Sequence, residues 1–507
     1  WEKRAKTNGK YANIWPLGKR GRNDHRGKDV NLTTLPVIIS DQRQMLKDWV
    51  NKDVAQVPQS ITLYEEIREI YNQGLKIPDD IILIWTDYNG NTIKQLPSRE
   101  EQKRSGGNGI YCHFQYRGGS TYEWLDTQPL ARTWQQMHMA YEHNVNSLWI
   151  VNVGDIKPHE YNMEYFMRLA WDINSWDNQN SRQFLLQWIE RDFGKEYAIP
   201  IADILEKHME LGYALRPEQL TEVDEASIFN MNTYNDELQR RIDDYDELMR
   251  QTDDVYAQLP TELKDAFFEM VVYNVKCAGL HNRKVLYAYK SKAYGKEKRA
   301  SAADYADLAQ KAARDIDALM EHYNTGLLTV KDKWNFFACY PEKADPESPF
   351  HKIWEIPETS RYNGVGDAEL KIAMEGNGDT LTNLSVYDKN RRFIDLYNTG
   401  KGTVKWKAGF EDWIKLSETA GTFTKEKRIW VTIDWDKAPK EENLSTVITF
   451  KGTGKSYNIP ISVSNPSLPK PNDIKGFAES HGYVSMEAEH YSRKFDKGVA
   501  GWNIING

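Results

Sequence analysis

Carboxylates and amides follow two apolar segments within the first 158 residues, in positions that suit acid–base chemistry. Residues 81–85 form a continuous apolar run, typical of a strand buried on both faces, and Asp87 and Asn89 come soon after it. Residues 148–151 form a second apolar run, followed in the same way by Asn152 and Asp155. Polar side chains at the ends of parallel strands are the groups from which barrel enzymes build their sites.

A third strand is predicted at residues 110–116, and it adds further candidates. His113 lies inside this strand, and two carboxylates, Glu123 and Asp126, follow it. Carboxyl groups held close together can act as a general acid and a general base. The sequence therefore predicts a cluster of acids, amides and one histidine at one edge of a sheet.

Each of these residues also has a structural interpretation that involves no chemistry. Asp87 could cap the turn after its strand, and Glu123 could be a solvated loop acid. Asn152 and Asp155 could satisfy loop backbone in an Asx turn, while His113 could be a buried histidine with its hydrogen bonds made. These alternatives remain open at the level of the sequence.

The strands and helices that would position the cluster are predicted to alternate along the chain. Apolar runs and amphipathic helices take turns between residues 35 and 151, which is typical of a parallel sheet in a (β/α) barrel or a doubly wound fold. The predicted elements are an apolar run at 35–39, a helix at 61–75, strands at 81–85 and 110–116, a helix at 129–143 and a strand at 148–151.

Two further regions follow with different periods. Residues 159–335 are predicted to form an α-helical bundle of about five helices, because apolar residues recur every three or four positions, as in 236–256. Residues 345–465 contain eight short segments of period two between Gly, Asn and Asp turns, which predicts a β-sandwich. Residues 466–507 are expected to be a Pro-rich linker and the start of a further, truncated β-domain, with a strand at 483–488.

Composition limits the classes of function. A chain of 507 residues is expected to hold several domains. No run approaches the roughly 18 apolar residues that a membrane span needs, and a net charge of −8 gives no basic face for nucleic acid. The three cysteines lack metal-binding spacing. The 17 tryptophans suit carbohydrate surfaces, where sugar C–H faces stack on indole, although large cores also use tryptophan.

Five segments carry a resemblance to a known family. They are LGKRGRNDH, GLKIPDDIILIWTDYNGNTIKQLP, RSGGNGIYCHFQYRGG, WIVNVGDIKPHEYNMEYFMRLAWD and GYVSMEAEHY. These segments and their order resemble glycoside hydrolase family 115, the α-glucuronidases that remove (4-O-methyl-)glucuronic acid from xylan. The resemblance implies that residues 1–158 are the C-terminal part of a (β/α)8 TIM-type catalytic barrel, so that the chain is a multidomain α/β protein. The family's N-terminal domain and early barrel strands have no counterpart here.

The chain departs from the family pattern at two places. It has GKRG at residues 18–21 where the family usually reads GMRG, and it has Asp87-Tyr88-Asn89 where the family commonly shows two acids before the asparagine. We take Arg20 and Asp87 as the retained positions. Asn23 and His25 fall near an expected polar pocket group.

The resemblance implies an inverting glycoside hydrolase that needs no cofactor or metal. Such an enzyme uses one carboxylic acid to protonate the leaving oxygen and one carboxylate to activate water, about 6.5 to 9.5 Å apart. The predicted catalytic residues are Asp87, Glu123 and Asp155, in that order, because Asp155 is close to Lys157 and could be paired with it. The partner acid could also lie upstream of Trp1.

A uronic acid substrate makes a second demand, because its carboxylate must meet cations or hydrogen-bond donors, preferably the planar fork of arginine. The predicted substrate-binding residues are the cations Arg20, Arg104 and Arg117, the neutral donors Asn89, His113 and Asn152, and Tyr116, which could stack on a sugar ring as Trp124 could. The expected partner is a glucuronic acid-bearing oligo- or polysaccharide, with a homodimer through the helical or C-terminal β-domains as a further prediction. The resemblance implies a secreted or periplasmic protein.

Other interpretations remain. The sugar could be carried by another plant glycan, such as arabinogalactan. The chain could instead be a non-catalytic carbohydrate-binding or scaffold protein, an alternative that gains weight because the early barrel strands are missing. A barrel that acts on chitin or hexosamines would share the strand pattern. Release of glucuronic acid from a decorated oligosaccharide separates these interpretations.

Overall fold

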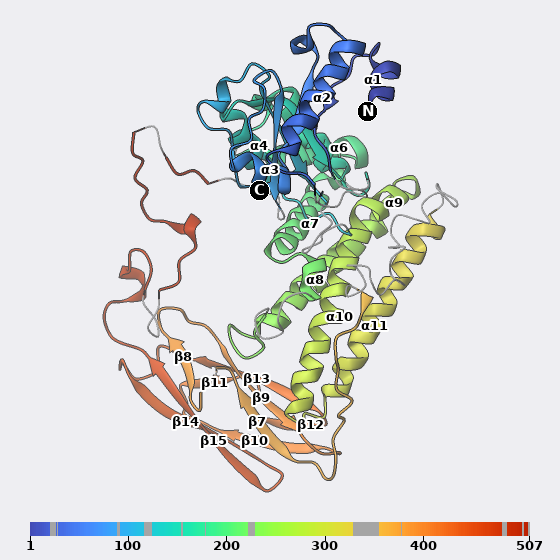
Figure 1. Ribbon diagram of the computed structural model, residues 1–507. Helices are drawn as coiled ribbons and strands as arrows, with labels where there is room; N and C mark the ends of the chain where they lie inside the picture. Colours follow the sequence, from blue (N-terminus) through green and yellow to red (C-terminus); the bar gives the residue numbers. More distant parts are fainter. Residues whose placement is uncertain are drawn as a thin grey trace. The chain divides into compact units, whose positions relative to one another are not determined.

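The computed structural model describes residues 1–20, 27, 29–88, 92–115, 124–153, 156–177, 179–221, 229–327, 354–376, 378–478, 484–498 and 501–504 (Figure 1). The chain divides into two compact units, residues 1–214 and residues 215–504. The first unit includes three helices that the sequence analysis assigns to the helical bundle: α5 (Glu160–Trp171), α6 (Ser181–Phe193) and α7 (Lys195–Ala214).

A curled parallel sheet forms the centre of the first unit. Its strands, hydrogen-bonded in this order, are β1 (Trp15–Pro16), β2 (Gln59–Thr62), β3 (Ile82–Tyr88), β5 (Asn108–His113) and β6 (Val145–Asn152); β4 (Thr92–Ile93) pairs antiparallel with β3. Parallel strands that follow one another in sequence order are typical of a (β/α) barrel, whereas a doubly wound sheet reverses its order. Within the described residues the sheet is part of a barrel and not a closed one.

Four helices complete the barrel part: α1 (Glu2–Asn8), α2 (Thr34–Trp49), α3 (Glu66–Asn72) and α4 (Leu130–Glu142), with short 3-10 turns at Val54–Gln56, Glu101–Lys103 and Ile173–Ser175. The predicted strands at 81–85, 110–116 and 148–151 are confirmed as β3, β5 and β6, with shifted ends. The helix at 129–143 is confirmed as α4.

The structure gives one predicted apolar run its type and corrects the start of one predicted helix. Residues 35–39 belong to helix α2, because Leu35, Ile39 and Leu46 recur at helical spacing and are buried together. The helix predicted at 61–75 begins only at Glu66, since Ile61 lies in strand β2 and pairs with Leu83 of β3. A short buried strand and the start of a helix are hard to separate by periodicity.

Helices open the second unit: α8 (Glu237–Gln258), α9 (Thr261–Phe267), α10 (Tyr273–Lys296) and α11 (Ala302–Glu321), with a 3-10 turn at Pro217–Thr221 and π-helical turns at Phe268–Val272 and His322–Gly326. Helices α10 and α11 run side by side (Figure 1). The apolar positions predicted in 236–256 do face a core, where Leu238 and Ile242 pack with Leu220, Val285 and Leu286.

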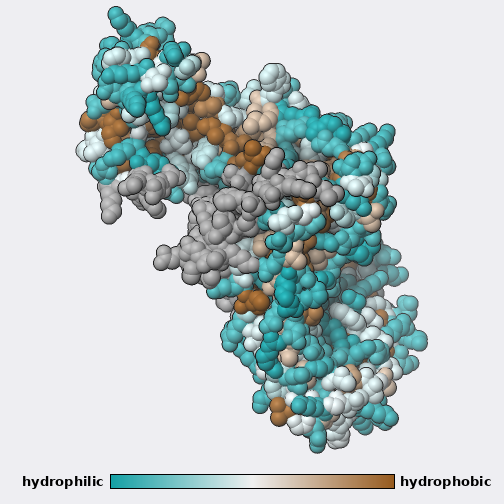
Figure 2. Space-filling model, turned by 90° about the vertical axis from the view of Figure 1, so that its right-hand side faces the viewer, coloured by the Kyte–Doolittle hydropathy of each residue, from teal (hydrophilic) through white to brown (hydrophobic). Residues whose placement is uncertain are grey.

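The β-region of the second unit is a sandwich of two sheets, as predicted. One sheet has the order β12 (Ala420–Phe423), β10 (Val404–Gly409), β14 (Leu444–Gly452), β15 (Lys455–Ser464), β8 (Leu381–Ser385); the other has β11 (Ile414–Leu416), β13 (Glu426–Ile433), β9 (Arg392–Asn398), β7 (Leu370–Met374). Side chains of both sheets form one core, including Leu396, Ile429, Trp406 and Phe450. Hydrophilic residues cover most of the sandwich surface visible in Figure 2. Strand β12 was not predicted, because its sequence AGTF buries only Phe423.

The C-terminal segment differs from its prediction. Residues 484–487, the described part of the expected strand 483–488, are exposed and form no strand, and a 3-10 turn follows at Ala488–His490. A strand needs a hydrogen-bonded neighbour, and none pairs with this segment among the residues that the structure describes. The linker holds another 3-10 turn at Pro471–Asp473. In the described part of the chain, no helix is long and apolar enough to cross a membrane.

Candidate functional site

The C-terminal ends of the parallel strands bring several predicted residues together. His113, the last residue of β5, is in register with Asn152, the last residue of β6. Asp87 lies near the end of β3, one residue beyond Thr86, which is in register with Tyr111 of β5. Parallel strands present their C-terminal ends at the same edge, so Asp87, His113 and Asn152 meet there.

Asp87 and His113 form a buried pair. The backbone N–H of His113 donates to Oδ2 of Asp87 at 2.9 Å, and the ring Nδ1 of His113 lies 2.5 Å from Oδ1. Both residues are buried, and Asp87 has no exposed surface. Burial raises the pKa of Asp87, although the contacts with His113 act in the opposite direction. The carboxylate therefore holds the backbone and ring of His113 at once.

Two tyrosines surround the His113 ring and join it to its neighbours. The ring centroid of Tyr111 lies 4.4 Å from that of His113, and the centroid of Tyr64 lies 5.8 Å away. The Asn152 amide donates to the Tyr111 hydroxyl at 2.8 Å. Tyr64 comes two residues after β2, and the N–H of the intervening Leu63 donates to the Ile84 carbonyl of β3. The site thus draws on the ends of four adjacent strands.

An arginine and a second buried carboxylate adjoin this cluster. The Arg20 guanidinium lies 5.2 Å from the centre of the Tyr64 ring, and its Nε is 3.7 Å from Oε1 of Glu66. Glu66, the first residue of α3, is only 2% exposed, and neither of its oxygens has a hydrogen-bond partner in the described structure. A buried carboxylate without hydrogen bonds is costly, so it marks a site where function is expected.

Glu66 is the residue that the sequence analysis missed. Glu66 falls inside the helix predicted at 61–75, and glutamate is common in helices, so the sequence offered no reason to select it. The available signal was weak, because strand β2 reads QSIT and only Ile61 in it is apolar. An acid that follows a barrel strand is nevertheless a candidate by the same rule that selected Asp87.

Comparisons with known proteins bear on the family and the fold of the chain. Residues 1–219 match the family model of glycosyl hydrolase family 115, and residues 476–507 match the model of the family's C-terminal domain. The predicted resemblance to glycoside hydrolase family 115 is confirmed. No curated protein matches the chain.

A solved structure is also similar to the chain. It is described as a novel family GH115 4-O-methyl-alpha-glucuronidase, BtGH115A, with specificity for decorated arabinogalactans. The two share 24% sequence identity with a TM-score of 0.61, and the match covers 86% of this chain. This likeness shows that the fold is shared. The chain spans 64% of the length of that structure.

The structure does not bring Arg104 to the cluster of Asp87, His113 and Asn152. The Arg104 guanidinium donates to the carbonyls of Ile77 and Ile81 at 3.4 and 3.2 Å, before the start of β3. Arg104 also precedes β5, so it lies at the N-terminal ends of the strands, opposite Asp87 and His113. Its position is explained by satisfying loop carbonyls, which places it outside the predicted uronate-binding set.

Several predicted residues lie outside the described residues. They are the catalytic candidates Glu123 and Asp155, the substrate-binding candidates Asn89, Tyr116 and Arg117, and the neighbouring Asn23 and His25. Trp124 is described and is buried, so in this structure it packs inside the protein and does not offer a surface for a sugar.

Asp126 is a buried anchor of the segment 124–129 that precedes α4. Its Oδ1 accepts from the Gln128 N–H at 3.1 Å, and its Oδ2 accepts from the Asn162 amide at 2.8 Å. Nδ1 of His159 lies 3.3 Å from Oδ1, and the Asp126 carbonyl is 2.8 Å from Nε2 of His208. Burial alone would raise the pKa of Asp126, but His159 and the hydrogen bonds outweigh it and lower the pKa.

We expect Asp126→Ala to destabilise the first unit by about 3 kcal/mol, because it leaves several buried donors without their acceptor. Since the folded-state pKa of Asp126 is lowered, its contribution is present above the unfolded pKa and is lost as pH falls through the folded pKa. Hydrogen exchange of α5 and the 124–129 loop at pH 7 measures the effect. Protection equal to that of the unchanged protein would contradict it. The control is Asp41→Ala, at an exposed position of α2.

Among the residues that the structure describes, no three histidine, cysteine or acidic side chains gather as metal ligands would. The buried thiols of Cys112 and Cys277 have raised pKa values because burial disfavours the thiolate. The arrangement at the strand ends can offer the Glu66 carboxyl, the His113 imidazole held by Asp87 and the Arg20 guanidinium to a ligand.

Proposed function

We propose that the chain is the barrel-containing part of a glycoside hydrolase that releases (4-O-methyl-)α-D-glucuronic acid from xylan or a related plant glycan. The observation that carries this proposal is the meeting of Asp87, His113, Arg20 and Glu66 at the ends of adjacent parallel strands. The family match supports it, as does the described activity of the similar solved structure. No cofactor or metal takes part in the proposed reaction.

Recognition of the uronate is assigned to groups that can meet its carboxylate. Arg20 supplies a cation, whose planar fork suits a carboxylate. His113 presents an imidazole held in place by Asp87, and Asn152 presents an amide anchored on Tyr111. These side chains donate hydrogen bonds to an acidic sugar more readily than to a neutral one, which fits glucuronic acid.

The reaction is assigned to two carboxyl groups in an inverting displacement. One carboxyl donates its proton to the glycosidic oxygen as the bond from that oxygen to the anomeric carbon breaks. The other carboxylate takes a proton from the water that attacks the anomeric carbon from the opposite face. Glu66 is proposed as one of the pair because it is buried and its oxygens accept no hydrogen bond within the described structure. Its partner is proposed to be Glu123 or Asp155.

Asp87 was predicted as the first catalytic carboxylate, and we now propose that it acts through His113. Both of its oxygens already contact His113, and the side chain has no exposed surface. A positioning role explains these contacts, because the carboxylate fixes the tautomer and orientation of the imidazole.

We expect Asp87→Asn to lower kcat/KM for glucuronic acid release by about 100-fold. The amide keeps the size of the side chain but cannot balance charge on the imidazole. Release from a glucuronic acid-decorated xylo-oligosaccharide is measured across pH, and the variant is expected to lose the limb of the profile that reports the Asp87–His113 pair. A merely structural role would leave the profile shape unchanged.

The matched control is Asp79→Asn, which alters an exposed aspartate before the start of β3. It is expected to retain the activity of the unchanged chain. If the unchanged chain binds the oligosaccharide but releases no sugar, the proposal gives way to a non-catalytic carbohydrate-binding or scaffold protein. Release of amino sugars in place of glucuronic acid would favour a hexosamine-active barrel.

The proposed partner is a glucuronic acid-bearing oligo- or polysaccharide. Plant glycans of this kind lie outside the cells that degrade them, so a secreted or periplasmic location fits the proposed substrate. A homodimer through the helical or C-terminal β-regions stays a prediction, which sedimentation of the full chain would test.

A further inference from the structure

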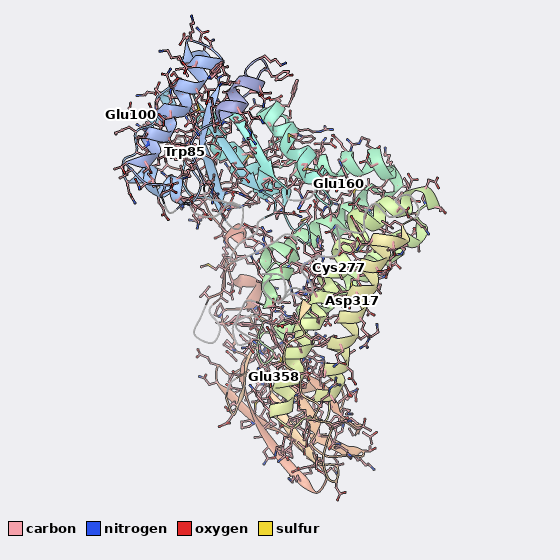
Figure 3. All side chains as sticks on the ribbon, turned by 45° about the vertical axis from the view of Figure 1, so that its right-hand side comes forward. Trp85, Glu100, Glu160, Cys277, Asp317 and Glu358 are labelled. Atoms are coloured by element: carbon pink, nitrogen blue, oxygen red, sulfur yellow. The ribbon has the colours of Figure 1, made fainter. Side chains whose placement is uncertain are left out.

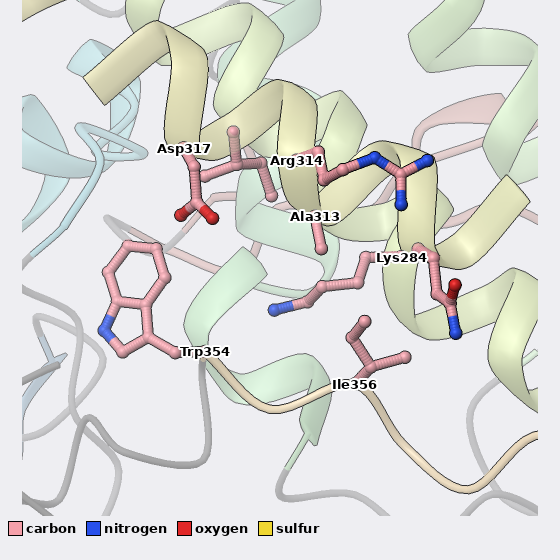
Figure 4. A pocket seen from close by; sticks show the side chains of 8 residues that line it. Lys284, Ala313, Arg314, Asp317, Trp354 and Ile356 are labelled. Carbon is pink, nitrogen blue, oxygen red and sulfur yellow. The ribbon is translucent and has the colours of Figure 1, made fainter. Parts of the chain in front are cut away.

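Polar side chains are buried in both units outside the strand-end cluster. In the second unit, the buried Lys284 lines a hollow of about 380 Å³ between α10, α11 and residues 354–356 (Figure 4). In the first unit, Asp126, His159 and Asn162 are at most 1% exposed and meet where α5 begins. The group in the first unit is also linked to the strand ends, and it is therefore the one with a connection to the proposed reaction.

Asp126 holds the segment 124–129 against the start of α5. Its Oδ2 accepts from the amide of Asn162, in the first turn of α5, at 2.8 Å. Its Oδ1 lies 3.3 Å from Nδ1 of His159, the N-cap residue of the same helix. Because all three side chains are buried, they have little room to move independently. One carboxylate thus joins the segment before α4 to the residue before α5.

His159 extends this contact to the end of β5. The centroid of its ring lies 6.1 Å from that of Phe114. Phe114 directly follows His113, and its backbone N–H donates to the Asn152 carbonyl at 2.8 Å. The His159 ring therefore packs against the residue that joins the ends of β5 and β6, next to the imidazole and the amide that are proposed to meet the uronate.

Two proposed carboxyl groups are close to this pair in the sequence. Glu123 comes three residues before Asp126, and Asp155 comes four residues before His159. Each residue of a chain has only two soft backbone torsions, so few torsions separate either acid from a buried, fixed neighbour. A reacting carboxyl must be held within about 0.5 Å of its productive place, which requires such support.

We propose that Asp126 and His159 are positioning residues of the strand-end site. They hold the end of β5 together with the segments 124–129 and 156–159, and they act on the reaction through those segments without touching the substrate. The effect on catalysis rests on the proposed function, whereas the effect on the end of β5 is independent of it. Two experiments on the full 507-residue chain test these two parts separately, with Asp126→Asn, His159→Asn and the double variant.

Hydrogen exchange tests the link to β5 and needs no turnover. The amides of Phe114 and Gln115 both donate to the Asn152 carbonyl, at 2.8 and 3.4 Å. In His159→Asn and in Asp126→Asn these two amides are expected to exchange about tenfold faster or more, because the ring that packs on Phe114 is lost or released. Unchanged protection of both amides in both variants would overturn the proposal.

Kinetics test the effect on the reaction. Each single variant is expected to lower kcat for glucuronic acid release from a decorated xylo-oligosaccharide by about 10- to 100-fold. KM is expected to change by less than about threefold, because Asp87 still holds His113 and Arg20 is unaltered. The double variant is expected to lose no more than the weaker single variant, since the two residues act as one unit. Multiplied losses, or a change in KM alone, would overturn the proposal.

The matched control is Leu46→Ala, which removes a fully buried side chain of α2 and so destabilises the same unit. Its folded fraction, measured by circular dichroism, is expected to keep the kcat of the unchanged chain. An equal loss of kcat in this control would assign the effect to stability and overturn the positioning role. If the unchanged chain releases no glucuronic acid, the proposed function fails, and the exchange of the Phe114 and Gln115 amides still decides whether the pair holds the end of β5.

Discussion

Glu66→Gln is expected to reduce the release of glucuronic acid by about 10³-fold or more while leaving the fold intact. The substitution keeps the shape of the side chain but removes the group that can donate or accept a proton. It also removes a buried carboxylate whose oxygens accept no hydrogen bond in the described structure, so its effect on stability is expected to be small or favourable.

Two substrates and one added nucleophile identify the role of Glu66. If it donates the proton, an aryl glucuronide with a good leaving group is cleaved nearly as fast by the variant as by the unchanged chain, because that bond needs no protonation. If it is the base, azide restores turnover by replacing the activated water, and the product is a glucuronyl azide of inverted configuration.

The control for this experiment is Glu100→Gln. Glu100 is an exposed glutamate next to the 3-10 turn 101–103 (Figure 3), and its carboxylate pairs with Lys103 at the surface. We expect its activity to match that of the unchanged chain. Full activity of Glu66→Gln on the natural linkage would remove Glu66 from the reaction and return attention to Glu123 and Asp155.

The site could be predicted in part from sequence because strands β3, β5 and β6 are long or strongly apolar. Residues 81–85 and 148–151 were recognisable as strands, and parallel pairing then sends Asp87, His113 and Asn152 to one edge. What sequence could not show is that Asp87 lies behind His113, because the direction of a side chain past a strand end depends on its hydrogen bonds. Asp87 is turned toward the His113 backbone.

The errors have a common physical cause, which is short elements whose partners are distant in sequence. Strand β2 has only four residues and is stabilised by pairing with β1 and β3. It is therefore too short to show a strand period in the sequence around Ile61. Glu66 was missed as a site candidate for the same reason, because the strand that precedes it was not recognised. Arg104 was chosen for its charge, but the carbonyls that bind it belong to residues 77–81, which no local pattern connects to it.

In the second unit, most helices and strands could be predicted from the sequence, whereas the contacts between them could not. Amphipathic period predicts α8 and alternation predicts most strands, but neither indicates that the helices and the sandwich share buried charges. Asp395 of β9 accepts from Arg428 of β13 at 2.7 and 2.9 Å and from Arg299, just after α10, at 3.2 Å. Arg428 also donates to Asp236, the N-cap of α8, at 2.7 Å.

Asp395→Ala is expected to destabilise the second unit by about 3 to 5 kcal/mol, the largest stability effect predicted for this chain. Arg299 is 2% exposed and stacks between the rings of Tyr294 and Tyr397, so its charge cannot turn to solvent when the carboxylate is removed. Without Asp395, Arg299 keeps only Glu297 and Arg428 keeps only Asp236 as a carboxylate partner among the described residues, so two buried guanidinium groups lose part of their compensation, which is costly. The loss is shared by helices and strands because Asp395 joins both.

The dependence of stability on pH tests the interaction of Asp395 with the two arginines independently. Burial would raise the pKa of Asp395, but Arg428 and Arg299 outweigh it and lower the pKa. The contribution of Asp395 is therefore present above its unfolded pKa and is lost as pH falls through the lower folded value. Asp395→Ala is expected to flatten the loss of stability of this unit in that acid range.

Hydrogen exchange measures the loss of stability region by region. This is needed because a chain of several cooperative units has no single, well-defined unfolding midpoint. Amides of β9 and of the C-terminal half of α10 are expected to exchange about 10² to 10³-fold faster in Asp395→Ala at pH 7, in step with each other. Asp379→Ala, at an exposed turn between β7 and β8, serves as the control. Faster exchange in β9 with unchanged protection in α10 would show that the carboxylate stabilises the sandwich alone, and that Arg299 does not couple the helices to it.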